Sequence, residues 1–304
     1  MLAIVIPYYK LTFFEQTIKS LANQTNKQFK VYIGDDASLE NPQTLLAEYK
    51  YKLNYSYKRF DENLGGISLV KQWNRCIELI GDEEWIMILG DDDYLESNVV
   101  ECWYNSFKEF KDKTNVIRFS TKDVLEQSNL IENKSCQPIW ENSIDSFFRR
   151  IKGLTGSSLS EHIFSRKSYE KFKFIDYPLA WHSDDQAWLD FSDGKPIFSI
   201  NNASCYIRIS NLSISGKNDN LDLKKEATLM FQKNFISEKF YLLNKSQKLE
   251  FLLIHETLLR SKSEIRNNNW NFIFKLYFKN FKLIPFLKLL RRFIKNRFRL
   301  HILK

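Results

Sequence analysis

Residues 85–93 read WIMILGDDD, which is five apolar residues, one glycine and three aspartates in direct succession. The apolar run has the length and composition of a buried strand, and the acidic run follows at its carboxyl end. Three adjacent carboxylates repel one another, and burial strengthens the repulsion. A divalent cation such as Mg²⁺ or Mn²⁺ relieves this repulsion. Such a cation is held by one or two carboxylates together with substrate phosphate oxygens. The alternative is a solvated acidic turn that caps a helix near Ser97.

Three earlier apolar runs, at Ala3–Pro7, Phe29–Ile33 and Leu53–Phe60, alternate with amphipathic helical patterns. Strands that alternate with helices form a mostly parallel sheet, whose ligands bind beyond the carboxyl ends of the strands. We therefore expect an α/β fold with a Rossmann-like, mostly parallel sheet flanked by helices. Thr12–Glu15 also fits a capping box at the start of the first helix.

Polar clusters follow three of these strands. Pro7-Tyr8-Tyr9 ends the first strand, Gly34-Asp35-Asp36 ends the second, and residues 90–93 end the fourth. Since these strand ends meet at one edge of the predicted sheet, we expect the three clusters to lie on one rim. For Asp35 and Asp36 the alternative is an Asx turn into the next loop.

Four short motifs follow one another along the chain: IPYY at 6–9, GDDAS at 34–38, NLGG at 63–66 and LGDDDYL at 89–95. Together they resemble family 2 glycosyltransferases, which are inverting enzymes with a GT-A fold. The resemblance covers residues 1–215 and is carried mainly by the first hundred.

The resemblance implies roles for particular nucleotide-binding and metal-binding residues. Pro7 and Tyr8 would flank the base of a nucleotide, and Asp36 would hydrogen-bond it. Asn63 and Gly65 would bring backbone close to the nucleotide, where glycine permits the approach.

In the family's Asp-x-Asp pattern the second Asp is the chief metal ligand, and it corresponds here to Asp92. The first Asp of that pattern falls on Gly90. Asp91, on the nucleotide side, and Asp93, on the metal side, are the residues that could compensate. The implied cofactor is Mn²⁺ or Mg²⁺.

The segment SDDQAW at 183–188 resembles the family's Glu-Asp-x-x-Trp segment. Inverting sugar transfer needs a group within hydrogen-bond reach of the acceptor hydroxyl to take its proton. We assign Asp185 as this catalytic base, with Asp184 as the second candidate. The alternative is that both are acids favoured by the positive end of a helix dipole. Trp181 and His182 would contact the acceptor, the alternative being a core tryptophan and a surface histidine.

Residues 206–210, YIRIS, resemble a late family segment written Arg-x-His. Arg208 would neutralise diphosphate charge, and Ser210 replaces the histidine that can complete the metal site. A plain strand arginine is the alternative.

The net charge of +8 is concentrated in the tail. Residues 262–304 contain twelve Lys or Arg and one acid, Glu264, so the preceding residues are slightly acidic. In the stretch 270–304, aromatic and aliphatic residues alternate with basic ones, and Pro285 divides it into two helical parts. Such a tail fits an amphipathic anchor on an anionic membrane surface. The alternative is a packing helix with a solvated basic face, and without a recognition module we expect no nucleic-acid partner.

Compartment signals are consistent with this picture. The four cysteines form no CxxC pair, which argues against a zinc site or a disulfide framework and favours a reducing compartment. No secretory leader precedes the first strand, and no apolar run reaches the roughly 20 residues of a spanning helix. We expect a cytoplasmic protein, peripheral at the inner face of the membrane.

We divide the chain into a GT-A-like catalytic domain at 1–215 and a helical C-terminal region at 216–304. The first comprises a nucleotide-binding half, 1–120, and an acceptor half, 121–215. The predicted reaction moves a sugar from a nucleotide-diphosphate donor, with a UDP-sugar favoured, to a hydroxyl of a glycan or lipid-linked glycan in bacterial surface polysaccharide synthesis.

Two rival functions stay open from the sequence. A sugar nucleotidyltransferase would show a Gly-rich basic loop near the first strand, where residues 7–10 read PYYK. A degenerate nucleotide-sugar-binding membrane scaffold would explain Gly90 and Ser210.

Overall fold

The computed structural model of the chain describes residues 1–125, 135–210, 213, 216, 220–261 and 267–302. Contacts divide it into two compact units, Met1–Ala227 and Thr228–Lys304, with the boundary inside one helix. The described strands all belong to the first unit. No helix among the described residues is long and apolar enough to cross a membrane.

The described strands form one nine-stranded sheet. They are β1 (Leu2–Tyr8), β2 (Phe29–Asp35), β3 (Tyr55–Arg59), β4 (Trp85–Ile88), β5 (Tyr94–Leu95), β6 (Val116–Leu125), β7 (Trp140–Glu141), β8 (His162–Ser165) and β9 (Ile197–Ile209). Their order is β3-β2-β1-β4-β8-β6-β9-β5, with β7 also paired to β9.

The predicted α/β class is confirmed, but the sheet is mixed. β1 to β4 are mutually parallel, as the strand-helix alternation predicts. β8 runs antiparallel to both β4 and β6, and β5 and β7 run antiparallel to β9. β6 pairs parallel with β9, so the sheet has one parallel block at β1 to β4 and a second parallel pair that the antiparallel β8 joins to it.

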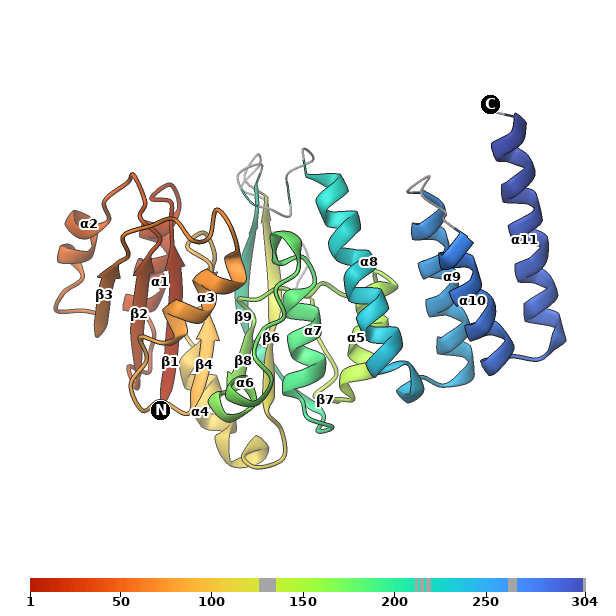
Figure 1. The fold of residues 1–304 in the computed structure, drawn as a ribbon. Coiled ribbons are helices and arrows are strands. Elements are labelled where there is room, and N and C mark those ends of the chain that lie inside the picture. Colours follow the sequence, from red (N-terminus) through yellow and green to blue (C-terminus); the bar gives the residue numbers. More distant parts are fainter. Residues whose placement is uncertain (126–134, 211–212, 214–215, 217–219, 262–266, 303–304) are drawn as a thin grey trace. The chain divides into compact units, whose positions relative to one another are not determined.

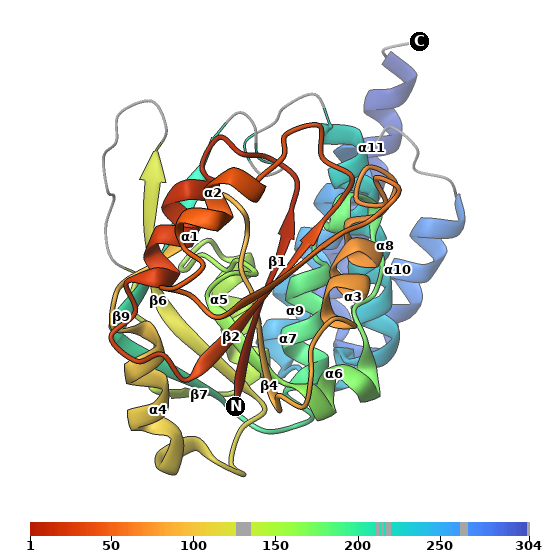
Figure 2. The same ribbon diagram turned by 90° about the vertical axis from the view of Figure 1, so that its left-hand side faces the viewer.

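Helices cover both faces of this sheet (Figures 1 and 2). The helices that begin in this unit are α1 (Phe14–Ala22), α2 (Gln43–Glu48), α3 (Leu69–Ile77), α4 (Val99–Phe110), α5 (Ser143–Ile151), α6 (Arg166–Phe172), the 3₁₀ helix η1 (Pro178–Ala180), α7 (Ser183–Phe191) and α8 (Leu221–Glu238). α1, α2 and α4 pack on one face of the sheet, and α3, α6 and α7 pack on the other.

The alternating direction of side chains along β1 explains how one strand contributes to two hydrophobic cores. Leu2, Ile4 and Ile6 belong to the cluster that includes α1 and α4, whereas Ala3 and Val5 belong to the cluster that includes α3 and α7. Successive strand residues point to opposite faces, so a strand buried on both sides reads as a continuous apolar run.

The predicted capping box at Thr12 is wrong. α1 begins at Phe14 with Phe13 as its N-cap residue, and no side chain caps it. The chain turns before the helix, since Phe14 N–H donates to the Leu11 carbonyl at 3.1 Å. Thr12 therefore lies within a turn, one residue too early for the cap.

The second unit is helical. It contains the end of α8, η2 (Phe240–Leu242), α9 (Lys245–Ser261), α10 (Asn267–Asn280) and α11 (Leu283–Ile302). Pro285 is the third residue of α11, where a missing N–H costs nothing. The break between the two helical parts of the tail thus falls at residues 281–282, just ahead of the proline.

Buried contacts hold α9, α10 and α11 together. Trp270 and Phe274 of α10 lie 4.9 and 5.3 Å, between ring centroids, from Phe293 of α11. Glu256 of α9 is fully buried, and both its oxygens accept from the guanidinium of Arg292 at 2.8–3.0 Å. Part of the basic tail is therefore a packed helical element.

Candidate active site

A cavity of about 650 Å³ opens at the carboxyl ends of β1 and β4 in the first unit. It brings together twelve of the thirteen predicted site residues. They are Pro7, Asp36, Asn63, Gly65, Asp91, Asp92, Asp93, Trp181, His182, Asp184, Asp185 and Arg208. The predicted convergence of polar strand ends on one rim is therefore observed, and residues from the second half of the chain complete the lining.

Tyr8 is the predicted site residue that does not line the cavity. Its side chain is fully buried, its ring packs 4.5 Å from that of Phe14, and its hydroxyl donates to the Glu40 carbonyl. Strand alternation explains the difference, because Pro7 and Tyr9 point to the side opposite Tyr8. Pro7 and Tyr9 line the cavity, and Tyr9 is 39% exposed.

The three aspartates after β4 differ in their surroundings. Asp91 Oδ2 accepts from the backbone N–H groups of Tyr9 and Lys10 at 2.7 and 2.8 Å, which ties the end of β1 to the end of β4. Burial, and then the charge of Asp92, raises the pKa of Asp91 to about 6. Asp91 thus organises the rim as well as lining it.

Asp93 is buried and engaged on both oxygens. Its Oδ1 accepts from the backbone N–H of Arg208 at 2.8 Å, and its Oδ2 accepts from the Ser160 hydroxyl at 2.5 Å. Burial, followed by the charge of Asp92, raises its pKa to about 8. These contacts connect the end of β4 to β9 and to the segment before β8.

Asp92 is only partly buried and faces the cavity. Burial raises its pKa as well. Its backbone carbonyl accepts from Arg208 Nε at 3.1 Å, while the guanidinium of Arg208 lies 4.0 Å from the ring centre of Phe13. Of the three carboxylates, that of Asp92 is the best placed to reach a ligand.

The neighbouring carboxylates give a steric reason for glycine at position 90. A Cβ added there would lie 2.9 Å from Asp92 Oδ1 and 3.2 Å from Asp93 Oδ2. The Gly90 N–H also donates to the Ser160 hydroxyl at 3.0 Å. The missing side chain therefore leaves space for the two carboxylates that follow.

These residues can accommodate a divalent cation only with help from a substrate. The described part of the chain holds no group of three or more His, Cys, Asp or Glu side chains gathered around a metal position. Mg²⁺, however, is commonly held by one or two carboxylates plus substrate phosphates. Three neighbouring carboxylates with raised pKa values fit that mode, because a cation would relieve their repulsion. Ser210, which stands where the family pattern has a histidine, is buried directly after β9.

Asp36 supports the loop that follows β3. Its oxygens accept from the backbone N–H groups of Leu64 and Gly65 at 2.8 and 2.9 Å, and it pairs with Arg75 of α3. Its pKa is raised by burial, against the opposing effect of these contacts. The loop that carries Asn63 and Gly65 is thus fixed to the end of β2.

The N-terminus of α7 and the residues just before it also line the cavity. His182 Nδ1 lies 2.7 Å from Asp185 Oδ2, and Arg150 Nε lies 3.9 Å from Asp185 Oδ1. Burial alone would raise the pKa of Asp185, but the hydrogen bond and charge of His182 outweigh it and lower the pKa. Burial, and then the charge of Asp185, raises the pKa of Asp184 to about 7.

Several lining residues were not predicted from the sequence. The main ones are Lys10, Phe13, Trp73, Arg150 and Ser160. Lys10 directly follows the predicted cluster Pro7-Tyr8-Tyr9, whose members Pro7 and Tyr9 also line the cavity. Arg150 lies on α5 with no motif around it, and only tertiary packing brings it to Asp185.

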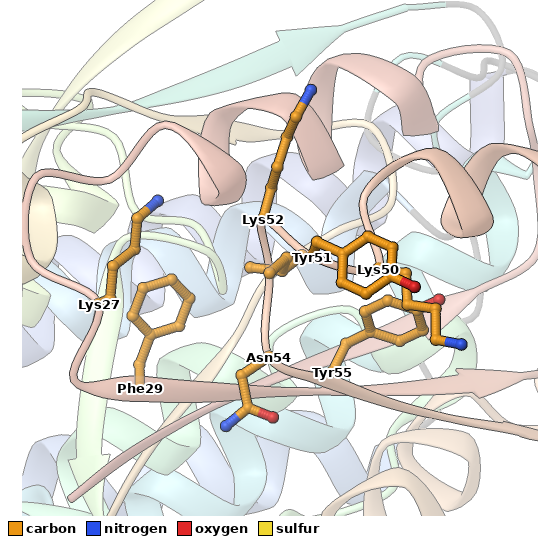
Figure 3. A pocket seen from close by; sticks show the side chains of 8 residues that line it. Lys27, Phe29, Lys50, Tyr51, Lys52, Asn54 and Tyr55 are labelled. Atoms are coloured by element: carbon orange, nitrogen blue, oxygen red, sulfur yellow. The ribbon is translucent and has the colours of Figure 1, made fainter.

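A second cavity, of about 550 Å³, lies at the other end of the strands. It is lined by Lys27, Phe29, Lys50, Tyr51, Lys52, Leu53, Asn54 and Tyr55 (Figure 3). Phe29 and Tyr55 are the first residues of β2 and β3. This cavity has no acidic side chain in its lining, and it lies away from the carboxyl ends of the strands, where ligands of such sheets bind.

Comparison with known families matches residues 3–172 to Glycosyl transferase family 2. The chain belongs to this family. It is a glycosyltransferase with a GT-A fold, as the four N-terminal motifs predict. Comparison with curated protein sequences gives no match.

Solved structures with the same fold include two glycosyltransferases. S. aureus TarS residues 1–349, in complex with UDP-GlcNAc, is 16% identical, with a TM-score of 0.64 over 97% of this chain and 81% of that one. Its complex with UDP gives 17% identity and a TM-score of 0.60, over 88% and 74% of the two chains. The mannosyltransferase PcManGT from Pyrobaculum calidifontis, in complex with GDP-Man and Mn2+, is 12% identical, with a TM-score of 0.55 over 97% and 79%.

Proposed function

We propose that this glycosyltransferase moves a sugar from a nucleotide-diphosphate donor, with inversion, to a hydroxyl of a glycan or lipid-linked glycan. A UDP-sugar is the favoured donor, because TarS of the same fold binds UDP and UDP-GlcNAc. The setting that we propose is the synthesis of a bacterial surface polysaccharide. The observation that carries the proposal is one cavity lined by an acidic cluster after β4 and by a second acidic cluster at the start of α7.

In this proposal the wall at β1, β2 and β4 binds the nucleotide. Pro7 and Tyr9 border the place of the base, which replaces our prediction of Tyr8, and Asn63 and Gly65 bring backbone to the nucleotide. Asp36 holds that backbone through two N–H groups. Arg208, which contacts the Asp92 carbonyl, supplies positive charge near the diphosphate.

A divalent cation, Mn²⁺ or Mg²⁺, would be held by Asp92 with Asp93 beside it. PcManGT, of the same fold, is found with Mn2+. When bound, the cation stabilises the negative charge of the departing diphosphate. The remaining chemistry, proton removal from the acceptor hydroxyl, belongs to Asp185, with Asp184 as the second candidate, while Trp181 and His182 border the acceptor.

The test is a thermal-shift screen with UDP, GDP, dTDP and CMP, each with and without Mn²⁺. A ligand that binds only the folded state raises the melting temperature by mass action. We expect one nucleotide to give a metal-dependent shift, which Asp92→Ala abolishes. Asp82→Ala is the matched control, because Asp82 is exposed and outside the cavity.

Two outcomes would count against the proposal. An unchanged metal-dependent shift in Asp92→Ala refutes the role of Asp92. The lack of a shift with every nucleotide favours the degenerate scaffold over the transferase.

We further propose that the tail at 270–304 docks on an anionic membrane surface, which would make the enzyme peripheral at the cytoplasmic face. The support is a stripe of exposed apolar side chains on α11, at Leu283, Ile284, Leu287, Leu290 and Ile294, between 36% and 68% exposed. Exposed Lys and Arg side chains flank it, at Lys282, Lys288, Arg291 and Lys295. Apolar contact with lipid and attraction to anionic headgroups then act together.

A further inference from the structure

The second cavity, at the amino ends of β2 and β3, concentrates positive charge. Lys27, Lys50 and Lys52 line it, and none of its described lining residues is acidic. The segments that form it, at 23–34 and 49–59, contain six Lys or Arg and no Asp or Glu, whereas residues 1–261 together carry a net charge of about −3. A local excess of positive charge on a slightly acidic background favours an anionic ligand.

Aromatic rings lie among these lysines (Figure 3). Phe29 is buried and Tyr55 is half-buried, so they supply the apolar part of the lining. The Tyr51 side chain is 94% exposed, which leaves an aromatic face in contact with water. The apolar C–H face of a sugar ring can cover such a face, and both surfaces gain from leaving water. The lining thus suits a ligand that combines sugar rings with negative charge.

The turn at 50–52, which carries two of the lysines and the exposed tyrosine, is fixed by its neighbours. The Tyr49 carbonyl accepts from the Leu53 N–H at 3.0 Å, and Leu53 is buried in the core. The Asn54 carbonyl accepts from the Val31 N–H of β2 at 3.0 Å. A turn that is already ordered presents its exposed side chains to a ligand at a lower entropic cost.

This cavity is separate from the catalytic one. Phe29, at the first residue of β2, lines the second cavity, and Asp36, directly after β2, lines the catalytic cavity. The strand between them spans about 23 Å, at 3.3 Å per residue. Its volume of about 550 Å³ lies within the usual range of ligand sites, about 300–1,000 Å³. A small ligand of one cavity therefore does not reach the other.

We propose that the second cavity binds a glycan that carries carboxylate or phosphate groups. Its lysines pair with the anionic groups, and Tyr51 stacks on a sugar ring. A glycan is the favoured polyanion because the chain is a glycosyltransferase. A glycan chain held here stays near the catalytic cavity, which raises its effective concentration there. The inference goes beyond the proposed reaction, since binding at this cavity requires neither a donor nor turnover.

Two other polyanions fit the observations less well. A membrane surface does not enter a concave site, and Phe29 and Leu53 are buried, which leaves little apolar surface to insert into lipid. Nucleic acids bind through the neutralisation of many phosphates, and three lysines neutralise few. Both are outcomes of the test below.

The test is lysine footprinting of the full chain. Limiting acetylation followed by peptide mass spectrometry reads each lysine separately, so ligand bound at the basic tail does not obscure the result. The probes are oligogalacturonate and phosphomannan, with dextran as a neutral glycan and polyphosphate as an anion without sugar. At about twice Kd, each acidic glycan should slow the acetylation of Lys50 and Lys52 about threefold by mass action. Dextran should not slow it, and Lys108 and Lys113, exposed and outside both cavities, should stay unprotected by every probe.

The double variant Lys50→Gln and Lys52→Gln tests the charge. Both side chains are exposed, so the variant should fold like the wild type. Lys27, whose ammonium donates to the Ala22 carbonyl, remains as the reporter lysine. We expect the Kd for either acidic glycan, read from protection of Lys27, to rise about three- to tenfold, in keeping with two exposed ionic contacts.

Tyr51→Ser tests the sugar contact and leaves Lys50 and Lys52 readable. We expect the Kd for both acidic glycans to rise about threefold or more and that for polyphosphate to stay unchanged, because only the glycans stack on the ring. The matched control is the double variant Lys108→Gln and Lys113→Gln, which removes the same charge outside the cavity. It should keep the wild-type Kd.

Three results would overturn the inference. If neither acidic glycan protects Lys50 and Lys52 more than dextran does, no acidic glycan binds there. If polyphosphate protects them as well as the glycans do and Tyr51→Ser changes nothing, the cavity recognises charge alone and the glycan assignment is wrong. Stronger protection by phosphatidylglycerol vesicles or by single-stranded RNA assigns the site to that partner. The assay contains no nucleotide, so a failed donor screen refutes the proposed function and leaves these results unaffected.

Discussion

At the scale of single residues, the cavity wall has least room for an added side-chain atom at Gly65, beside Asp36. A Cβ at Gly65 would lie 2.5 Å from Asp36 Oδ2, closer than any real Cβ contact. The same oxygen accepts the Gly65 N–H at 2.9 Å. An alanine therefore cannot enter without breaking the contact that fixes the loop.

We expect Gly65→Ala to destabilise the protein by about 1–3 kcal/mol, the usual result of leaving a buried polar group without its partner. The melting temperature should fall by several degrees. Nucleotide affinity should fall as well, because the loop that brings backbone to the nucleotide moves. Thermal melting, and calorimetric titration with the nucleotide from the screen, measure the two effects.

Gly156→Ala is the matched control for this substitution. A Cβ at Gly156 would meet no atom within 4 Å. Its effect on stability should stay within about 0.5 kcal/mol, as for ordinary surface positions. Equal stability and nucleotide affinity in the two variants would show that Gly65 carries no steric constraint.

Single residues also show where sequence reasoning succeeds and where it fails. Asp36, Asp92 and Arg208 lie in short motifs, so a resemblance of a few residues was enough to place them on one cavity. Tyr8 was assigned by motif position alone, although the period of two along β1 turns it into the core. Arg150 has no local signal, because its place beside Asp185 depends on how α5 packs on α7.

At the scale of elements, the strands β1, β2 and β4 follow from pattern because each of them is a mainly apolar, buried run. β1, β2 and β4 were predicted to within about two residues. The antiparallel pairing of β8 between β4 and β6 was not predicted, since local sequence does not fix which strands meet. That pairing makes the sheet mixed and brings α7 to the cavity.

α11 has two apolar faces. Phe286 and Phe293 of α11 pack on Phe274 of α10, with ring centroids 5.9 and 5.3 Å away, and Leu289 is fully buried. The stripe at Leu283, Leu287, Leu290 and Ile294 repeats every three or four residues and stays exposed. The packing and the membrane interpretations of the tail therefore concern different faces of one helix, and both can hold.

The exposed face of α11 should determine vesicle binding. We expect the triple variant Leu283→Ser, Ile284→Ser and Leu287→Ser to lower partitioning onto phosphatidylglycerol-containing vesicles by at least tenfold. The physical reason is that each of these side chains contributes on the order of 1 kcal/mol or more when it leaves water. Vesicle cosedimentation at fixed lipid concentration measures the effect.

The paired variant Tyr241→Ser and Leu242→Ser tests whether other exposed apolar residues of this unit also contribute to vesicle binding. These side chains on η2 are 74% and 50% exposed, and they lie outside the tail. Their loss should leave vesicle binding unchanged. If both variants bind vesicles like the wild type, the tail is not a membrane anchor.

At the scale of the whole molecule, charge and chemistry are divided between different parts of the chain. The residues that line the cavity all belong to Met1–Ala227, whereas the exposed stripe of α11 belongs to Thr228–Lys304. The whole chain carries +8 and residues 262–304 alone carry twelve basic residues and one acid, so residues 1–261 carry a net charge of about −3. An anionic surface should therefore attract the tail and not the catalytic unit.

Donor binding and membrane binding should consequently be separable. We expect the α11 triple variant to lose vesicle binding and to keep its nucleotide Kd within about twofold of wild type. We expect Asp92→Ala to lose metal-dependent nucleotide binding and to keep vesicle binding. Raising the salt concentration from 0.05 to 0.5 M should weaken vesicle binding strongly, because the tail's exposed charges are screened. If either variant lost both activities while its melting temperature stayed at the wild-type value, the two functions would be coupled, and the tail would then act on the active site as well as on the membrane.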